Sequence, residues 1–314
     1  MSEIELVCTE FGPALELLKG AGFRLDVIYP ADDPHTALLS RNGEAVRLTS
    51  NPGESPPAEL PPFEPRFVLS RAGGEAGEGR AGMLYRDLIP KRLGGRYIAS
   101  HISIPEGGPV ADWVHYHRIQ FQMIYVRRGW VKVVYEGQGE PFVMQSGDMV
   151  LQPPEIRHRV LENSAGLEVV EIGCPALHAT LADHDMSLPN GIADPQRDFS
   201  GQQFLRHQAA ATPWTAFAGG EAQESGMEDA TGGLAQARTI HAPQGNLSFP
   251  GHGGELVFAF VLDGTARLDF EGKHELGPAD SFVIPADVPW SIADASADFR
   301  MLHVTTERSI GKSA

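Results

Sequence analysis

The sequence predicts a mainly β protein in which a small β-α-β-β-β module precedes two tandem β-barrels of one kind. Two observations support the β class. Short runs rich in Val, Ile, Phe and Tyr alternate with 35 glycines and 24 prolines, and convincing helical periodicity is rare. Short strands that end at Gly, Pro or Asp residues are typical of antiparallel barrels and sandwiches. A third observation, an internal repeat, predicts that the barrel occurs twice.

Only two segments carry helical periodicity. The first is Gly12–Gly20, where Leu15, Leu17 and Leu18 would form one buried face and glycines mark the end. The second is Pro175–His184, a short run after the last strand of the first barrel. We therefore expect one helix in the N-terminal module and one between the barrels.

The first 60 residues are predicted to form a separate module. The run IELVCT reads as a strand, GPALELLKG as a helix, and FRLDVIYP, HTALLSRN and AVRLTS as three more strands. This order resembles one half of a glyoxalase or extradiol-type module, the vicinal oxygen chelate fold. Such halves normally pair to form a metal cleft, and only one is visible. We expect a structural role, packing on a barrel or on a second subunit. The alternative is an activity formed by pairing across a dimer.

The internal repeat sets the domain boundaries. Residues 94–107 align with residues 232–245 at an offset of 138, Gly129 aligns with Gly264 at 135, and Pro153 aligns with Pro285 at 132. Loop deletions between equivalent strands would produce such a slowly falling offset. We expect the module at 1–60, a first barrel at 66–185 and a second at 200–306.

The first barrel contains one cluster of metal-ligating residues, with the pattern H-x-H-x4-Q-x6-G followed by G-D-x4-P-x4-H. Its potential ligands are His115, His117, Gln122 and His158. Alternation along a strand places His115 and His117 on one face. Neutral imidazoles suit Fe, Zn, Mn, Ni or Cu. A single histidine would more often be a packed residue, but three at this spacing favour a metal site.

These motifs resemble the two conserved motifs of the cupin family. Gly108, His115, His117, Gln122 and Gly129 occupy the places of the first motif, and Gly147, Pro153 and His158 those of the second. Glu155 stands where the family has glycine, and Asn163 comes one residue late. The resemblance implies a bicupin, with two double-stranded β-helix (jelly-roll) barrels. It also implies a divalent metal ion on His115, His117, His158 and Gln122.

Gln122 departs from the glutamate usual in the family. An amide does not neutralise a charge of the ion, so we expect a centre more electropositive than one with a glutamate ligand. Some cupins with glutamine here, such as those acting on unsaturated uronates, remain metal-dependent. A three-histidine centre with Gln122 as a hydrogen-bonding neighbour is the alternative.

The second barrel has lost the ligand set. The repeat aligns Pro250, His252, Val257 and Trp290 with His115, His117, Gln122 and His158. One imidazole cannot hold a divalent metal tightly, so we expect a structural barrel for packing or dimerisation. A ligand role for His252 is the less favoured alternative.

Composition narrows the class of partner. Lys and Arg total 25 against 41 Asp and Glu, a net charge of −16, which argues against nucleic acid or an anionic membrane as a partner. The two cysteines, Cys8 and Cys174, lie far apart and predict no disulfide framework. No segment has the apolar length of a membrane span. We expect a cytoplasmic protein and a homodimer.

Function follows from the metal cluster. We expect a metal-dependent enzyme that acts on a small oxygen-rich substrate, namely a carboxylate, enol or aromatic compound. Fe(II) would favour dioxygenation, whereas Zn, Mn or Ni would favour isomerisation, hydrolysis or elimination. No catalytic residue stands out as a general base, and Glu162 is the nearest in sequence. The alternative is a non-catalytic small-molecule-binding or sensor cupin.

Overall fold

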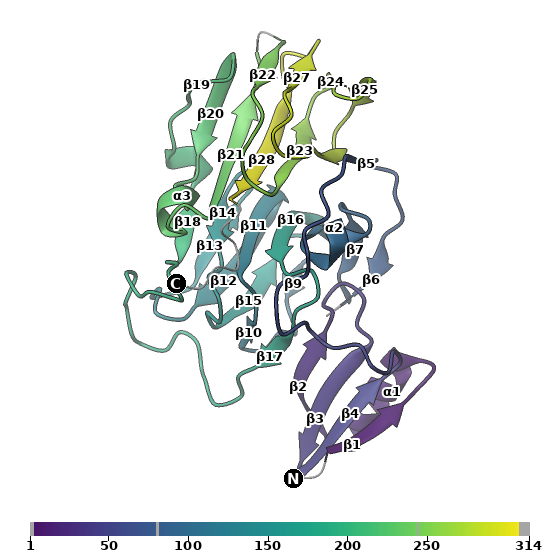
Figure 1. Cartoon of the computed structure of the whole chain (residues 1–314). Helices are drawn as coiled ribbons and strands as arrows, with labels where there is room; N and C mark the ends of the chain where they lie inside the picture. Colours follow the sequence, from purple (N-terminus) through teal and green to yellow (C-terminus); the bar gives the residue numbers. More distant parts are fainter. Residues whose placement is uncertain (1–2, 80–81, 244, 308–314) are drawn as a thin grey trace.

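The chain forms two stacked β-barrels with a small α/β module below the first, as Figure 1 shows. This computed structural model describes residues 3–79, 82–243 and 245–307. Strands dominate throughout, and the described helices are short apart from one in the module. The predicted mainly β fold with two tandem barrels is confirmed.

The N-terminal module has the element order that the sequence predicts. Its elements are β1 (Glu3–Val7), α1 (Phe11–Gly20), β2 (Arg24–Tyr29), β3 (Thr36–Arg41) and β4 (Glu44–Thr49). The strands lie in the order β1-β4-β3-β2, with β1 parallel to β4. Phe11 of the helix packs on Ile28, Leu39 and Leu48 of the sheet. The likeness to a glyoxalase half module stays a prediction.

The module continues a sheet of the first barrel. Strand β2 pairs with β17 (Thr180–Ala182) through Thr180↔Ile28 and Leu181↔Val27. On its other side β17 pairs with β10 (His115–His117). The helix expected over Pro175–His184 is therefore wrong: the backbone groups of β17 bond to two neighbouring strands instead of to one another. The module packs on the barrel.

The first barrel consists of two sheets. The larger sheet continues from the module through β17, β10, β15 (His158–Asn163), β12 (Trp130–Tyr135) and β13 (Phe142–Gln145), with β9 (Gly108–Pro109) beside β15. The second sheet runs in the order β18 (Leu205–His207), β14 (Met149–Leu151), β11 (Phe121–Arg128), β16 (Leu167–Cys174), β8 (Ile98–Ile104), β7 (Leu84–Asp87) and β6 (Gly77–Glu78). The helical turn α2 (Arg92–Gly95) precedes β8.

The second barrel repeats this plan. One sheet runs in the order β19 (Thr215–Phe217), β20 (Gly220–Glu224), β21 (Ala235–His241), β28 (Arg300–Thr306), β23 (Val257–Asp263), β26 (Ser281–Val283) and β5 (Val68–Ser70). The other contains β22 (Leu247–Phe249), β27 (Trp290–Ala293), β24 (Ala266–Asp269) and β25 (Lys273–Leu276). The short helices η2 (Ala209–Ala211) and α3 (Met227–Ala230) lie between β18 and β21 in the chain.

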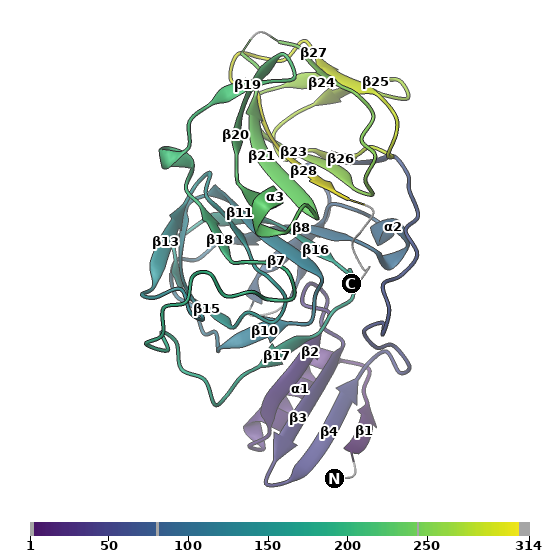
Figure 2. The same ribbon diagram turned by 60° about the vertical axis from the view of Figure 1, so that its left-hand side comes forward.

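The two barrels exchange strands. Strand β5 precedes the first barrel in sequence but pairs with β26 of the second. Strand β18 follows the first barrel's last strand and pairs with β14, at the edge of the first barrel's sheet. Figure 2 shows the long segments that carry the chain between the barrels. The domain boundaries therefore remain a proposal drawn from the repeat.

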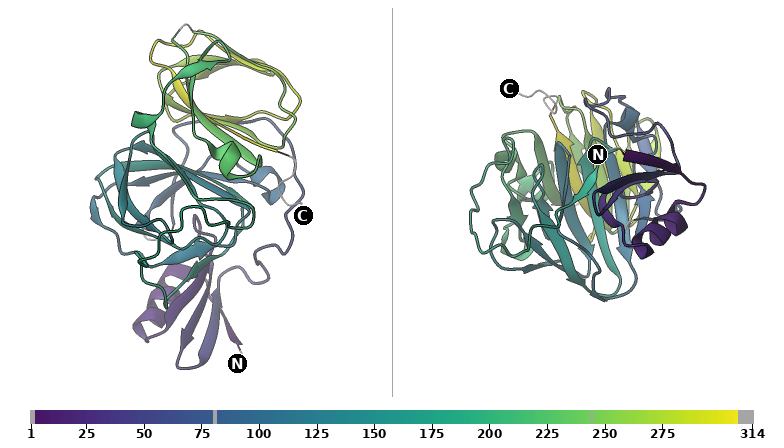
Figure 3. Two further views of the ribbon diagram at one scale, coloured as in Figure 1. Left: turned by 90° about the vertical axis from the view of Figure 1, so that its left-hand side faces the viewer. Right: turned by 90° about the horizontal axis from the view of Figure 1, so that it is seen from below.

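A shared apolar core joins the barrels, which Figure 3 shows stacked one above the other. In β11, Phe121, Met123 and Tyr125 belong to this core, whereas Gln122 and Ile124 face the cavity inside the first barrel. This two-residue alternation is the period of a strand. Strand β11 therefore holds the barrels together with one face and contributes to the site with the other.

Candidate metal centre

Three histidines meet inside the first barrel. His115 and His117 lie on β10, and His158 begins β15 directly opposite His115. One potential ligand atom from each ring lies within 4.8 Å of the other two, and all three side chains are buried. Tyr116, between the first two, lies under the guanidinium of Arg157 at 4.0 Å. The strand alternation expected from the sequence thus brings the three rings together.

Each ring is oriented by a hydrogen bond at Nδ1. His115 Nδ1 donates to the Trp113 carbonyl oxygen at 2.8 Å, and His158 Nδ1 to that of Ile156 at 3.0 Å. His117 Nδ1 lies 3.1 Å from Thr180 Oγ1. A neutral imidazole that donates from Nδ1 carries its lone pair on Nε2, which is the form that binds metals. Such partners commonly fix the ring orientation of metal-ligating histidines.

Gln122 lies at the same cavity, and its two amide atoms differ sharply. Its Nε2 donates to Glu171 Oε1 at 2.5 Å. Its Oε1 is buried and has no hydrogen-bond partner among the described residues. Because an amide oxygen is an acceptable metal ligand, the donor set fits an ion held by three imidazoles and one amide oxygen.

Glu171 is a site residue that the sequence reasoning missed. It lines the cavity with Leu167 and Val169 of the same strand, and among the described lining side chains it is the only acidic one. The signal was present in the sequence, since LEVVEIGC places a glutamate in phase with two inward-facing apolar residues. The expectation of a more electropositive centre is revised, because a carboxylate lies directly against Gln122.

Asp112 adds a second carboxylate near the histidines. Its Oδ1 lies 3.5 Å from His115 Nδ1, and its Oδ2 accepts a hydrogen bond from the Val160 backbone at 2.9 Å. The carboxylate is buried. A carboxylate beside a ligating histidine raises the basicity of the ring. Asp112 therefore supports His115 from outside the ligand set.

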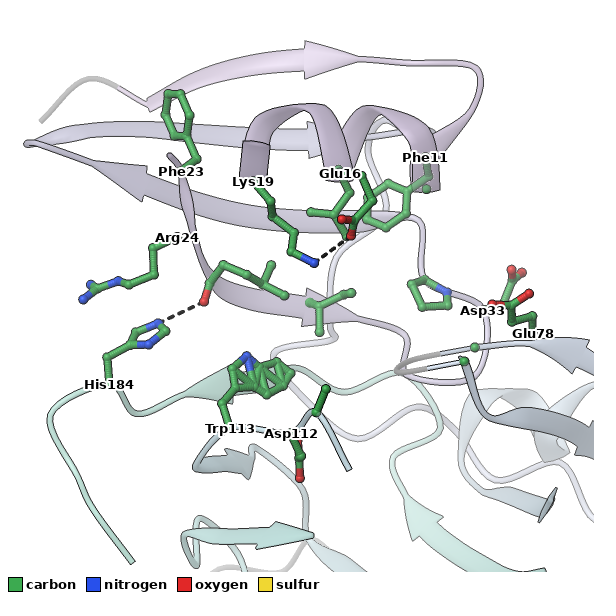
Figure 4. A pocket seen from close by; sticks show the side chains of 18 residues that line it. Phe11, Glu16, Lys19, Phe23, Arg24, Asp33, Glu78, Asp112, Trp113 and His184 are labelled. Carbon is green, nitrogen blue, oxygen red and sulfur yellow. Dashed lines mark hydrogen bonds and ion pairs between the residues drawn. The ribbon is translucent and has the colours of Figure 1, made fainter. Parts of the chain in front are cut away.

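Asp112 and Trp113 also form the wall of a separate groove of about 930 Å³ between the module and the barrel. Figure 4 shows Lys19 and Glu16 of α1 on one side of this groove and Trp113 and Asp112 on the other. His184 Nε2 donates a hydrogen bond to the Leu25 carbonyl oxygen at 2.9 Å.

The metal cavity is small and mostly apolar. Its volume is about 110 Å³, and the part of the chain that the structure describes contributes no arginine or lysine to its lining. Its apolar lining consists of Ala31, Met83, Ile102, Ile104, Ile124, Val131, Val133, Met144, Val160, Leu167 and Val169, together with the ring of Tyr85. Besides the residues already described, Gln152 and Tyr135 add polar atoms, and Gln152 Nε2 donates to Tyr135 Oη at 2.8 Å. Burial raises the pKa of Tyr135, so its phenol stays neutral.

Glu162 does not line this cavity. Lys132 pairs with Glu162 but Val133 pairs with Val160, so Leu161 is an extra residue at a bulge. A bulge breaks the two-residue alternation, which removes the reason to place Glu162 on the His158 face. A fourth histidine, His178, packs edge-on against His117 at 5.5 Å but donates Nδ1 to the Pro175 carbonyl and lies outside the cavity lining.

The second barrel fills the corresponding space with aromatic rings. Trp290 stacks on Phe249 at 3.8 Å with an angle of 4° between the rings. The strand register pairs Phe249 with Trp290 as it pairs His115 with His158, so Phe249, not Pro250, is the counterpart of His115. Among the described residues, His252 has no two further potential ligands close enough to share a metal ion with it. Its Nε2 lies 3.5 Å from a carboxylate oxygen of Glu307.

Comparisons with known proteins agree with this architecture. Residues 100–172 match the family model of the cupin domain. That range includes the three histidines, Gln122 and Glu171. No curated protein sequence gives a significant match. Within the described ranges, no helix is long and apolar enough to cross a membrane.

Several solved structures share the fold at low sequence identity. A variant of oxalate decarboxylase from Bacillus subtilis has 10% identity and a TM-score of 0.56, and covers 83% of this chain and 80% of its own. Salicylate 1,2-dioxygenase from Pseudaminobacter salicylatoxidans has 16% identity and a TM-score of 0.56, with 79% and 86% covered. Protein Ylba from E. coli has 11% identity and a TM-score of 0.55, with 80% and 95% covered.

Proposed function

We propose that the first barrel is the catalytic domain of a metal-dependent enzyme that acts on a small oxygen-bearing substrate. The observation that carries this proposal is the group of three buried histidines with ligand atoms within 4.8 Å of one another, in the cavity inside the first barrel. His115, His117 and His158 would hold the ion, and Gln122 Oε1 would supply a fourth ligand. The ion would be divalent Fe, Zn, Mn or Ni.

When bound, a divalent ion in such a site polarises a substrate oxygen and stabilises negative charge that develops on it. The protein's own residues contribute orientation and exclusion of water. The Nδ1 hydrogen bonds fix the imidazoles, and the apolar walls offer water few hydrogen-bond partners. A dry site strengthens electrostatic interactions between its charged groups.

The lining favours an aromatic or enolic substrate over a dicarboxylate. Ile124, Val133 and Leu167 provide apolar surface for a ring or hydrocarbon face, and among the described lining residues there is no lysine or arginine to pair with a second carboxylate. A volume of about 110 Å³ limits the substrate to a small molecule. The fold neighbour that is a salicylate 1,2-dioxygenase supports a dioxygenase of small aromatic compounds as the first reaction to test. An isomerase or lyase is the next.

The first experiment is elemental analysis of the purified chain, before and after supplementation with Fe(II), Mn(II), Zn(II) and Ni(II). We expect about one equivalent per chain, as for a single closed site, and its loss in His115→Ala and His158→Ala. The matched control is His252→Ala in the second barrel, which should keep the full metal content. Metal binding that persists in His158→Ala would reject the proposed site.

The second experiment screens oxygen uptake by the iron-loaded chain on small aromatic and keto-acid compounds. Turnover that is lost in His115→Ala would support the enzyme. A chain that binds metal and these compounds without converting any of them would instead be the small-molecule-binding protein that the sequence leaves as the alternative. The homodimer and the cytoplasmic location remain expectations, to be tested by light scattering and by fractionation.

A further inference from the structure

We propose that Glu171 is the positioning residue of the metal centre: it holds the Gln122 amide with Oε1 toward the histidines and supplies the negative charge that Gln122 lacks. This inference rests on the proposed function, since it assigns roles to residues around the same ion. Its evidence is the contact between the two side chains, their places on neighbouring strands, and the unpartnered amide oxygen.

The contact with Glu171 determines the orientation of the Gln122 side-chain amide. A carboxylate only accepts hydrogen bonds, so the amide end that touches Glu171 is the NH2 group, at 2.5 Å. The carbonyl oxygen then has to point elsewhere. It is buried, lines the cavity of the three histidines and lacks a hydrogen-bond partner among the described residues. A free glutamine could present either end, and Glu171 selects the oxygen.

The strand register explains how the two side chains meet. Gln122 of β11 lies opposite Gly173 of β16, and Ile124 lies opposite Glu171. Gln122 and Glu171 are therefore diagonal neighbours on one face, a separation that long side chains can bridge. The position opposite Gln122 is closely packed, since a Cβ at Gly173 would come within 2.9 Å of Ile119 Cδ1.

The second barrel shows that the pair is not required by the barrel itself. There Ala259 lies opposite His303, as Ile124 lies opposite Glu171, and Val257 lies opposite Thr305. The barrel that has aromatic rings in place of the histidines thus has valine in place of Gln122 and histidine in place of Glu171. The second barrel therefore lacks both the histidine ligands and the Gln122–Glu171 pair. This joint absence links the pair to the metal site.

The energetics point the same way. A buried polar atom without a partner costs about 1–3 kcal/mol. Gln122 Oε1 is such an atom, on a residue that lines the same cavity as the three histidines, and a cation bound by it would satisfy it. The carboxylate of Glu171 would then balance part of the ion's charge through the amide, as the partner of a metal ligand does in many sites.

The test compares metal affinity in four proteins: the wild type, Glu171→Gln, Gln122→Glu, and the exchange variant Gln122→Glu/Glu171→Gln. Zn(II) titration gives the affinity, and the visible spectrum of bound Co(II) reports the ligand set independently of any turnover. We expect Glu171→Gln to lose about 10- to 100-fold in affinity and to change the Co(II) spectrum. We expect Gln122→Glu to bind poorly as well, because two carboxylates then face each other.

The exchange variant is the decisive protein. It moves the carboxylate to position 122 and leaves an amide donor at position 171, so it should recover at least about tenfold of the lost affinity. Because the exchange variant keeps one amide and one carboxylate in contact, it should fold even if Glu171→Gln does not. The inference can then still be tested with it. The matched control is Glu168→Gln on the same strand. Its side chain pairs with His101 and Arg127 outside the cavity lining, and its Zn(II) affinity should be that of the wild type.

The outcomes separate the two proposals. A wild-type chain that binds neither Zn(II) nor Co(II) overturns the proposed function and this inference with it. A wild-type chain that binds both ions, with unchanged affinity and spectrum in Glu171→Gln, overturns only the role of Glu171. An exchange variant that binds no better than the weaker single variant also overturns it.

Discussion

At the scale of single residues, the candidate metal centre depends on the partners of its imidazoles as much as on the imidazoles themselves. His115 and His158 donate from Nδ1 to backbone carbonyl oxygens two residues earlier in the chain. A side-chain substitution cannot remove these backbone acceptors. The third Nδ1 atom meets a side chain, Thr180 Oγ1, from a strand 63 residues farther along the chain. His117 is therefore the ring whose support can be tested by mutation.

We predict that Thr180→Val weakens metal binding about tenfold while the fold is kept. Valine has nearly the shape of threonine but cannot hydrogen-bond to His117 Nδ1. Zn(II) titration measures the change. The matched control is Thr36→Val, which removes a buried hydroxyl contact with Thr49 in the N-terminal module. It should cost about 1 kcal/mol of stability and leave metal affinity unchanged. Equal affinities in Thr180→Val and the wild type would contradict the prediction.

The buried imidazole of the second barrel predicts a dependence of stability on pH. Burial, with smaller effects of charges on Arg238 and His252, lowers the pKa of His303 from 6.5 to about 3. Between these values the unfolded chain binds a proton that the folded chain excludes. Stability is therefore full above pH 6.5 and falls as the pH drops toward 3.

We predict that His303→Leu flattens this dependence, because leucine takes up no proton in either state. Urea unfolding at pH 7 and pH 5 measures it. The loss of stability between the two conditions should be smaller in the variant than in the wild type. His101, His178 and His207 also have pKa values lowered by burial, so part of the dependence should persist. An unchanged loss in the variant would show that His303 does not contribute.

The sequence was enough to predict the three histidines and Gln122 as neighbours. Two-residue alternation on one strand places His115 and His117 on one face, and the resemblance to the cupin motifs added Gln122 and His158, which returns from a strand 43 residues away. The sequence did not predict Glu171, whose contact with Gln122 joins strands 49 residues apart. The repeat also aligned Pro250 with His115, whereas the structure makes Phe249 the counterpart of His115. An alignment based on glycines and prolines does not detect a shift of one residue in a loop.

At the scale of elements, β17 is the strand on which module and barrel depend. It lies between β10, which carries two histidines, and β2 of the module. A strand this short has little stability of its own and takes it from its neighbours. The N-terminal module thus supports the strand that orients His117.

We predict that a chain beginning at Arg66 binds metal several-fold more weakly and associates more readily. Without β2, the edge of β17 is exposed, and exposed edges pair with other chains. Ala31, which lines the cavity, would also be lost. Zn(II) titration and light scattering measure the two effects. A truncated chain with wild-type metal affinity and no added association would show that the module is dispensable. Full turnover in it would also exclude an activity carried by the module.

The sequence predicted the class and order of most elements but not their long-range pairing. The repeat located equivalent strands such as β8 and β21, because each barrel is built from one local plan. The exchange of β5 and β18 between barrels could not be predicted, since a three-residue strand carries no signal for its partner. The segment around β17 misled the helix prediction because its pairing partners lie in the module and in β10.

At the scale of the whole molecule, the two barrels form one structural unit. Phe121, Met123 and Tyr125 from the first barrel meet Phe258 and Phe260 from the second in one buried cluster. A core shared in this way links the stability of the two barrels. The second barrel, although it lacks the ligand set, therefore stabilises the strand that carries Gln122.

One polar contact at this junction gives a sharp test of the linkage. Glu255 of the second barrel accepts hydrogen bonds from Arg96 Nε at 3.0 Å, Arg96 Nη2 at 2.8 Å and Tyr97 Oη at 3.0 Å, all from the first barrel. The side chains of Arg96 and Glu255 are only 10% and 11% exposed. A guanidinium so enclosed depends on its carboxylate partner.

We predict that Glu255→Gln lowers the free energy of unfolding by about 3 kcal/mol, because it removes the carboxylate charge that the buried guanidinium of Arg96 contacts through two nitrogens. Thermal unfolding should show a single transition at lower temperature, followed both by Trp fluorescence and by release of bound Zn(II). The matched control is Asp263→Asn, which breaks a half-exposed pair with Arg300 in the second barrel and should cost less than about 1 kcal/mol. Two separate transitions, with Zn(II) released only in the later one, would show instead that the barrels unfold independently and that the shared core does not link them.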